Sequence, residues 1–303
     1  MQIPFVKYAK YLLAVSAIVT IISLGALFKW GLKPSIDFTG GSLLEISFSG
    51  VVPDNDAVAA TLKSVGQENV LIQKTDNNKL IIRTAFLDEN QHQNVLKGLR
   101  AKFENKDNKV NEDQFETIGA AVSSQLRQRS IVAVILVVLS IVAFVAYAFR
   151  NVSFPVASWK YGVTAIVAAM HDVLLVVGVF AFLGHYHNVE VDIGFVVALL
   201  TVMGYSVQDT IVVYDRIREN LLHRRAGNFS EMIDIGLNET LMRSINTTLS
   251  TMIPLIALYV FGGSSIRNFA LALLLGIASC AYSSIFVASP LLAYVDKFQN
   301  KKK

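Results

Sequence analysis

The sequence has little charge and almost no cysteine. Of its 303 residues 17% are charged, and Cys280 is the single cysteine, which excludes an intramolecular disulfide framework. It also lacks a phosphate-binding loop, a nucleophile elbow, a zinc signature and a nucleic-acid-binding module. We therefore expect no enzyme activity, no cofactor, no metal and no nucleic-acid partner. With 53% hydrophobic residues and a mean hydropathy of +0.49, the chain has too little polar surface for a water-soluble globule.

What the sequence does have is long apolar runs, each reaching the roughly 17–25 residues that a helix needs to cross a bilayer. The runs are Tyr11–Phe28, Ser130–Phe149, Tyr161–Leu183, Ile193–Tyr214, Ser244–Ser265 and Asn268–Val295. The first could be a signal peptide, but it is long for that role and no small-residue cleavage pattern follows it, so a retained helix is favoured. The sequence predicts a polytopic α-helical membrane protein with six transmembrane helices. The expected parts are 1–31 with the first helix, a soluble domain at 32–128, and 129–303 with the other five helices.

The distribution of Lys and Arg predicts the orientation in the membrane. An even number of spans puts both termini on one side. The basic residues on that side are Lys7, Lys10, Arg150, Lys160, Arg216, Arg218, Arg224, Arg225, Lys297, Lys301, Lys302 and Lys303. The short loops on the other side hold only Arg267. Both termini and the loop 215–242 are therefore expected in the cytoplasm of a bacterium, and residues 32–128 in the periplasm. An anionic lipid or a cytoplasmic partner is an alternative reading of the arginine cluster at 216–225.

The insertion at 32–128 shows alternating strand and helix patterns. Leu44, Ile46 and Phe48 alternate as in a strand, and Val58, Leu62 and Val65 recur at helical spacing. Residues 70–73 and 80–83 flank a hairpin signal at 75–79, Asp88 opens a second helix with Val95, Leu96, Leu99 and Phe103 on one side, and residues 114–118 form a last strand. The order β-α-β-β-α-β predicts a small α/β domain, a ferredoxin-like sandwich.

Three ionisable residues in or beside the apolar runs are candidates for function, because charge is costly inside a bilayer. Asp209 lies about 8 Å from the cytoplasmic end of its run, and Arg243 begins the next helix from the same side, so the two are expected at similar depth and able to pair. Asp172 lies about 16 Å deep, near the midplane. The alternative is that both aspartates are hydrogen-bonded glue between helices and that Arg243 snorkels to the interface.

Weaker signals receive structural interpretations. His185-x-His187 could ligate a metal, but no further ligand completes a site, so an interfacial loop is favoured. His171 adjoins Asp172, yet neighbouring helix positions point about 100° apart, so the pair need not act together. Gly276, Cys280 and Ser284, at four-residue spacing, predict close helix packing.

Several segments together resemble the SecD/SecF family of accessory subunits of the bacterial Sec translocon, and its SecF branch in particular. The residues Asp37, Phe38, Thr39, Gly40 and Gly41, preceded by Ile36, resemble the signature that follows the first helix of that branch. The match returns at Tyr205–Asn220, Leu241–Thr248, Arg267–Leu271, Tyr282–Phe286 and Ser289-Pro290, and more weakly at His171-Asp172. Gln208 and Tyr214 stand where Asn and Phe are common. The resemblance covers almost the whole chain.

The resemblance implies a subunit that pairs with SecD into a twelve-helix unit of the RND superfamily type. Such a unit docks with the SecYEG channel and uses the proton-motive force to help exported preproteins across the inner membrane. On that reading Asp209 carries the proton and Arg243 is its charge partner, with a carboxylate on SecD and with Asp172 as a further candidate. YajC and YidC are additional candidate partners, and no cofactor is needed. Two other classes stay open at this point, half of an RND-type small-molecule or lipid exporter and a non-conducting scaffold for membrane-protein insertion.

Overall fold

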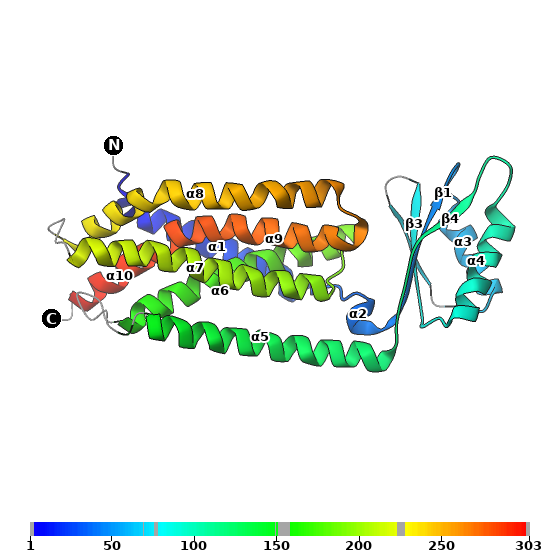
Figure 1. The fold of residues 1–303 in the computed structure, drawn as a ribbon, viewed down its shortest axis with the longest axis horizontal. Helices are drawn as coiled ribbons and strands as arrows, with labels where there is room; N and C mark the ends of the chain where they lie inside the picture. The colour runs from blue at the N-terminus through cyan, green and yellow to red at the C-terminus, as the bar shows by residue number, and fades with distance from the viewer. Residues whose placement is uncertain are drawn as a thin grey trace. The chain divides into compact units, whose positions relative to one another are not determined.

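The computed structural model describes residues 3–68, 70–75, 78–148, 150, 158–222 and 228–300, which form two compact units (Figure 1). One unit consists of Met1–Lys33 and Ile131–Lys303, and the other of Pro34–Ser130. The hairpin residues Asp76 and Asn77, the end of the second apolar run at Phe149, and the basic residues Arg224, Arg225 and Lys301–Lys303 lie outside the described residues.

Six spans in the described part of the chain are long and apolar enough to cross a membrane, as predicted. They are α1 (Phe5–Trp30), α5 (Ala120–Ala148), α6 (Ser158–His187), α7 (Ile193–Leu222), α8 (Phe229–Phe261) and a composite sixth span. The sixth span joins α9 (Ser264–Ser283), the π-helix η1 (Ser284–Ala288) and α10 (Ser289–Asn300). The segment 215–242, expected as a loop, is largely helical, because α7 continues to Leu222 and α8 already begins at Phe229. Arg243 therefore lies well inside α8 rather than at its start.

The buried centre of this unit is built mainly from α6, α7 and the sixth span. In the most apolar stretch of the sixth span 61% of the residues are buried, compared with 6% in that of α5. Small residues allow close approach: a Cβ added at Gly276 of α9 would lie 2.1 Å from Cγ2 of Val202 in α7. The thiol of Cys280 donates to the Val202 carbonyl. The predicted packing role of Gly276 and Cys280 is thus confirmed.

The π-helix interrupts the sixth span at one place. Pro290 follows it and has no N–H to donate to the preceding turn, and such breaks in membrane helices are relieved by local π adjustments and by hydroxyl side chains. The hydroxyl of Ser289 donates to the carbonyl of Ser284 at 3.1 Å, five residues earlier. The hydrogen-bond register therefore changes at Ser284, a residue whose side chain reaches into the centre of the bundle.

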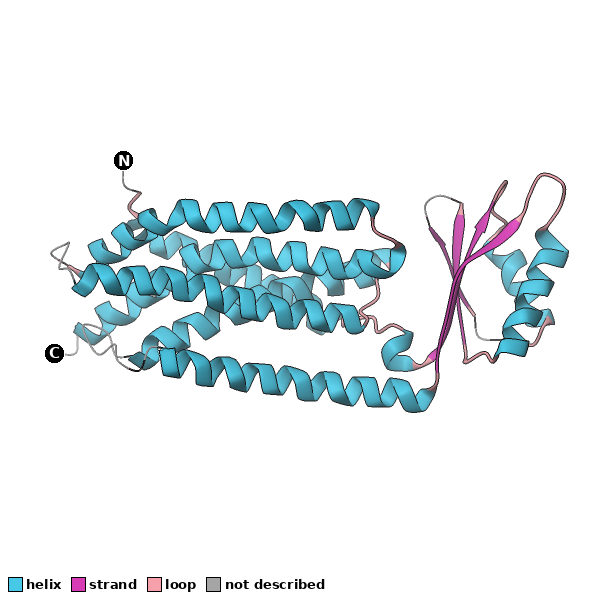
Figure 2. Ribbon diagram, in the orientation of Figure 1, coloured by secondary structure: helices cyan, strands magenta, loops and turns pink. Residues whose placement is uncertain are grey.

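The second unit is a four-stranded antiparallel sheet with two helices on one face (Figure 2). Its elements are β1 (Gly41–Phe48), α3 (Asn55–Ser64), β2 (Leu71–Thr75), β3 (Lys79–Thr84), α4 (Glu89–Phe103) and β4 (Val110–Ile118). The strand order β2-β3-β1-β4 with antiparallel pairing is that of a ferredoxin-like sandwich, as predicted. β4 begins at Val110, four residues before the predicted start, because Val110 pairs with Phe48 although charged residues follow it.

The helix-facing side of this sheet forms the core of the unit. Leu44, Ile46 and Phe48 alternate into it, as predicted, and meet Val58 and Leu62 of α3 and Val95, Leu96 and Leu99 of α4. The start of α4 is fixed by a capping box, in which Asp88 accepts from the backbone N–H of Gln91 (2.8 Å) while the Gln91 side chain accepts from that of Asp88 (3.0 Å). Burial of these side chains supplies the main stabilisation of the unit.

The opposite face of the sheet carries an ion-pair network instead. Nζ of Lys79 on β3 lies 2.8 Å from Oε1 of Glu45 and 2.7 Å from Oδ2 of Asp113. Hydrogen bonds from Lys79 to Asp113 and Glu45 raise the pKa of Lys79. Partial burial alone would raise the pKa of Asp113, but hydrogen bonds from Lys79 and Ser47 outweigh it and lower that pKa. The network joins β1, β3 and β4 through side chains as well as through the backbone.

The double glycine before β1 makes a tight turn. A short helical turn, α2 (Ile36–Thr39), is capped by the hydroxyl of Ser35 and includes Asp37, Phe38 and Thr39 of the signature. Gly40 and Gly41 follow with φ of 76° and 119°, a region that favours glycine. A Cβ at Gly41 would lie 2.6 Å from the carbonyl oxygen of Thr84 on β3. The positive φ values of both glycines make this turn possible, and it places β1 directly against β3.

Candidate functional site

Asp172 lies on α6 with no exposed surface and is held by serine hydroxyls. Ser206 of α7 (2.6 Å) and Ser283 (2.7 Å) donate to its Oδ2, and Ser279 of α9 (2.6 Å) donates to Oδ1. These donors satisfy a buried carboxylate without an ion pair to lysine or arginine among the described residues. The arrangement fits the reading of Asp172 as polar glue that joins α6, α7 and the sixth span.

His171 contacts Asp172, which the helix geometry alone did not predict. Nδ1 of His171 lies 3.3 Å from Oδ1 of Asp172, and its ring stacks on Tyr282 with centroids 6.1 Å apart. The separation of about 100° between neighbouring helix positions therefore does not prevent contact between these two side chains. An imidazole beside a carboxylate adds a second titratable group to the cluster.

Asp209 lies half-buried on α7, one turn beyond Ser206. The Ser244 hydroxyl on α8 donates to its Oδ1 at 3.1 Å, and the Ser284 hydroxyl at the first position of η1 donates to its Oδ2. The carboxylate thus touches three spans at once. We call Ser206, Ser244, Ser279, Ser283 and Ser284 the hydroxyl cluster; these residues, together with Asp172 and Asp209, form the polar centre of the bundle.

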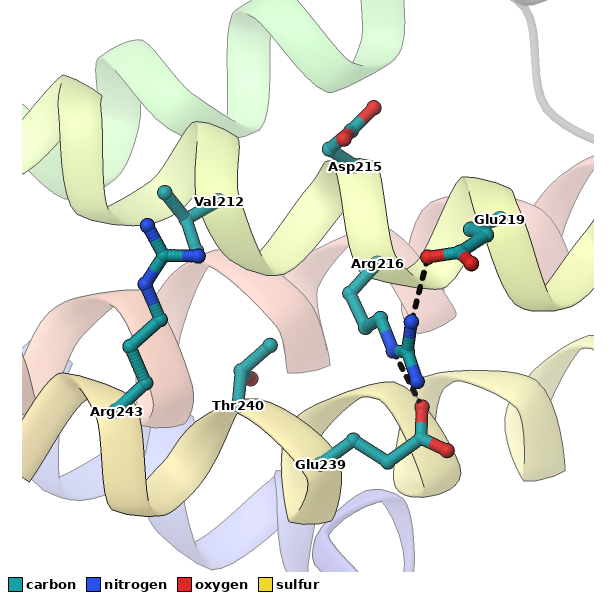
Figure 3. A pocket seen from close by; sticks show the side chains of 7 residues that line it. All are labelled: Val212, Asp215, Arg216, Glu219, Glu239, Thr240 and Arg243. Atoms are coloured by element: carbon teal, nitrogen blue, oxygen red, sulfur yellow. Dashed lines mark hydrogen bonds and ion pairs between the residues drawn. The ribbon is translucent and has the colours of Figure 1, made fainter.

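Arg243 lies on α8 immediately before Ser244, but its side chain is exposed and it forms no ion pair with Asp209 in the described part of the chain. Its charge still acts on the Asp209 carboxylate at longer range, as does that of Asp172. The two residues lie at similar depth, as expected, because Ser244, the chain neighbour of Arg243, reaches Asp209, but the expected direct pair is not formed among the described residues. In Figure 3 the guanidinium of Arg243 points toward Val212 of α7 and away from Arg216 and Glu239.

A polar cluster joins α7 and α8 further along the same helices. Arg216 donates through Nε to Oε2 of Glu239 at 2.7 Å and through NH1 to Oε2 of Glu219 at 2.6 Å (Figure 3). Asn220 donates to the same Oε2 of Glu239 at 2.9 Å. Beside it a cavity of about 280 Å³ is lined by Val212, Asp215, Arg216, Glu219, Glu239, Thr240 and Arg243. On α7 the lining of the cavity begins at Val212, three residues after Asp209.

The weaker sequence signals have structural roles. His185 and His187 end α6 instead of forming a loop, and His185 stacks on Trp30 with centroids 5.4 Å apart. Among the described residues no group of three His, Cys, Asp or Glu side chains is arranged to hold a metal ion. The aromatic contact with α1 explains why the helix continues to His187.

The hydroxyl cluster was not predicted from the sequence. Ser284 was identified, but only as a small residue for packing. The available signal was spacing: Ser206 precedes Asp209 by three residues, and Ser279 and Ser283 are four apart in an apolar run, so each pair shares a helix face. Serine is common in membrane helices for packing alone, so only the positions of the carboxylates distinguish these hydroxyls.

The fold and the site together define a polytopic membrane protein with a buried carboxylate cluster and a small α/β domain. Comparison with known proteins narrows this class. Residues 99–298 match the family model of the protein export membrane protein SecD/SecF, C-terminal, and residues 25–50 match that of the SecD/SecF GG motif.

Relatives and a solved structure agree with the family models. The protein translocase subunit SecF of Thermobaculum terrenum is 43% identical over 297 residues, which cover 94% of this chain and 91% of the relative. That of Synechocystis is 35% identical over 315 residues, covering 100% and 97%. The crystal structure of SecDF, a translocon-associated membrane protein from Thermus thermophilus, matches with a TM-score of 0.82 and 31% identity over 98% of this chain and 39% of the longer SecDF chain. The chain belongs to the SecD/SecF family, and the relatives of Thermobaculum terrenum and Synechocystis are SecF subunits of the protein translocase.

Proposed function

We propose that this chain pairs with SecD in a bacterial inner membrane and uses the proton-motive force to promote the export of preproteins through SecYEG. Its family membership supports the role in protein translocation. The observation that carries the proton coupling is Asp209, an ionisable side chain in a membrane helix that contacts α8 and the sixth span at the same time.

The proposed mechanism is an exchange of partners at Asp209. In the ionised state the carboxylate accepts from Ser244 and Ser284 and is attracted by Arg243. A proton on Asp209 removes that attraction and turns one carboxyl oxygen into a donor, so α7, α8 and the sixth span no longer have the same favoured arrangement. A change of charge at such a junction biases a two-state arrangement of helices.

In this proposal a carboxylate on SecD completes the relay and Asp172 anchors it from α6. Both termini face the cytoplasm, and residues 32–128, including the ferredoxin-like domain, face the periplasm. Preproteins are the transported substrates, and YajC and YidC are further partners to test. Recovery of SecD and SecYEG with the tagged chain in mild detergent supports this assignment, whereas recovery of an outer-membrane partner without them favours an exporter of the RND type.

The decisive experiment replaces Asp209 by Asn. This variant keeps the volume and hydrogen bonding of the side chain but removes the titratable group. We expect it to accumulate and bind SecD normally, and to lose secretion of a reporter driven by the proton gradient. Asp209→Glu is expected to retain more activity than Asp209→Asn.

The matched control is Asp215→Asn, which removes an exposed carboxylate from the same helix and is expected to leave secretion unchanged. If Asp209 is only structural, the pattern differs: Asp209→Asn supports secretion and Asp209→Leu destabilises the protein. Wild-type secretion by Asp209→Asn in membranes with equal protein would end the proposal for this residue.

A further inference from the structure

Two adjacent serines bind the two buried aspartates separately. Ser283, the last residue of α9, donates to Oδ2 of Asp172 at 2.7 Å, and Ser284, the first residue of η1, donates to Oδ2 of Asp209. Both serines are fully buried. A single peptide unit in the sixth span therefore connects a carboxylate of α6 with a carboxylate of α7.

The backbone at this point is not ordinary α-helix. Ser284 begins the π-helix, and its carbonyl accepts the hydroxyl of Ser289. Single π turns are less favourable than α-helix and are frequent at functional sites. Ser284, which binds Asp209, is itself the first residue of the π turn. A change in its hydrogen bond to Asp209 therefore acts on the part of the span whose backbone hydrogen bonds depart from the α-helical pattern.

A second connection runs through α7. Ser206 donates to the same Oδ2 atom of Asp172 that Ser283 binds, and Asp209 lies on the same face of α7 one turn later. Among the described residues, further charged or titratable groups near the pair are His171 of α6, Arg243 of α8, and Cys280 and Tyr282 of α9. The charge of Asp172 also acts directly on Asp209 through space. A test must therefore separate the hydroxyl connection from this direct repulsion.

We propose that Ser283 and Ser284 are positioning residues that couple the protonation of Asp209 to the buried carboxyl group of Asp172 and so to the register of the sixth span. The proposal rests on the proposed function of Asp209 as the proton carrier. When water delivers a proton to Oδ2 of Asp209, that oxygen becomes a donor and the Ser284 hydroxyl turns to accept from it. Ser283 stays bound to Asp172 and holds the end of α9, so the rearrangement falls on η1.

The coupling is measurable without any export assay. The full chain is purified with SecD in lipid nanodiscs, and the carboxyl stretching band that disappears in Asp209→Asn is titrated by infrared difference spectroscopy. Asp172→Asn is expected to move the pH midpoint of this band toward acid by about one unit, because it removes a neighbouring negative charge and relaxes the serines. In the background of Ser283→Ala with Ser284→Ala, the same substitution is expected to move the midpoint by less than about a third of that.

Threonine substitutions and an exposed serine provide the controls. Ser283→Thr with Ser284→Thr keeps both hydroxyls and is expected to restore the full shift, which loss of packing alone does not explain. Ser250→Ala removes an exposed hydroxyl of α8 and is expected to leave the midpoint unchanged. An equal shift from Asp172→Asn in the serine and alanine backgrounds overturns the proposal, since the coupling is then direct repulsion.

The results distinguish a failure of the serine coupling from a failure of the proposed proton-carrier role of Asp209. If Asp209→Asn still exports the reporter, the proton-carrier role is wrong even where the titration shows coupling. If Asp209→Asn abolishes export but the shifts are equal in both backgrounds, the carrier role stands and the serine coupling is wrong. A band for Asp209 that does not change between pH 4 and 10 contradicts the coupling as well, because the proposal requires that this side chain titrate.

Discussion

Ser244 donates a hydrogen bond of 3.1 Å to Oδ1 of Asp209, while the side chain of the adjacent Arg243 is exposed. A hydroxyl is neutral and can rotate, so it leaves the carboxylate able to exchange a proton. Arg243 stays near enough for its charge to act on Asp209. The guanidinium of Arg243 therefore lies near the Asp209 carboxylate without forming a direct salt bridge with it among the described residues.

We predict that Arg243→Met abolishes proton-driven export while the protein still accumulates. Without the cation, the ionised form of Asp209 loses its attractive partner, and we expect the secretion rate to fall by at least about tenfold. Arg243→Lys keeps the charge and is expected to retain part of the rate. Arg218→Met, at a partly exposed position on α7 where the guanidinium lies 3.9 Å from Asp215, is the control. Equal secretion rates for Arg243→Met and Arg218→Met would show that Arg243 only anchors the helix end.

We predict that valine at either residue of the double glycine impairs folding of the α/β unit or export, and that Gly41→Val is the more severe. At Gly41 a side chain meets both a φ of 119° and the Thr84 carbonyl, whereas at Gly40 the nearest atom, Oγ of Ser123, is 3.3 Å away. Positive φ alone costs a β-branched residue on the order of 1–3 kcal/mol. The measurement is the amount of protein in the membrane together with amide exchange in β1.

Gly119→Val is the matched control for the glycine experiment. Gly119 has no positive φ, and an added Cβ there would have only Phe86 at 3.9 Å as a neighbour. Normal levels and activity of both double-glycine variants would favour a flexible linker, contrary to the turn described above.

We predict that Tyr214→Phe destabilises the membrane unit by about 1 kcal/mol, the usual net contribution of a buried hydrogen bond. The Tyr214 hydroxyl lies 2.6 Å from Oγ1 of Thr164 on α6 and donates to the carbonyl of Ala288 in η1 at 3.0 Å. Tyr11→Phe, at a largely exposed position of α1, is the control. The check is thermal unfolding of both variants in the same detergent, and identical midpoints would contradict a role for the hydroxyl.

We predict that the Lys79–Asp113 pair makes the α/β unit sensitive to acid. Because the folded-state pKa of Asp113 lies below its ordinary value of 3.8, its contribution to stability is present above that pH and is lost as the pH falls through the folded value. The pKa of Lys79 is raised above 10.5, so its contribution is complete below that pH and is lost only above it. Between these limits the pair adds no pH dependence.

The acid sensitivity is measured by amide exchange of β1 and β4 in the full chain as the pH is lowered below 4. Asp113→Asn is expected to be less stable near neutral pH and to show a smaller loss in acid. Asp107→Asn, on the exposed turn before β4, is the control. A steeper acid loss in Asp113→Asn than in the unmodified protein would contradict the assignment.

We predict that a reporter fused at Asn77 is exported, and that reporters fused at Ala226 or Lys303 stay in the cytoplasm. The basic residues expected to face the cytoplasm fix this orientation. The measurement compares a phosphatase reporter, active only after export, with a fluorescent reporter active in the cytoplasm. Phosphatase activity at Ala226 would require one span more or fewer between Leu183 and Tyr214.

The membrane spans and the fold of the inserted α/β unit could be predicted from local sequence patterns alone. Long apolar runs must be helical in lipid, because the backbone has no other partner there, so hydropathy alone located six helices. In the α/β unit the alternation at Leu44, Ile46 and Phe48 and the Asp88 cap depend on residues close in the chain. Both features were therefore readable without tertiary information. β4 was recognised only in part because its polar residues are ordered by pairing with β1.

The arrangement of the site around Asp172 and Asp209 depends on tertiary contacts and could not be predicted from the sequence. Asp172 and Asp209 were visible as costly charges, but their donors come from α7, α8 and the sixth span, far away in the sequence. The π register at Ser284 and the hydroxyl bound to Oδ1 of Asp209 depend on how these helices pack. Helical periodicity shows which face a serine occupies, but not which helix lies opposite. For that reason the sequence predicted a direct pair between Asp209 and Arg243, whereas in the structure Ser244 and Ser284 donate to the Asp209 carboxylate.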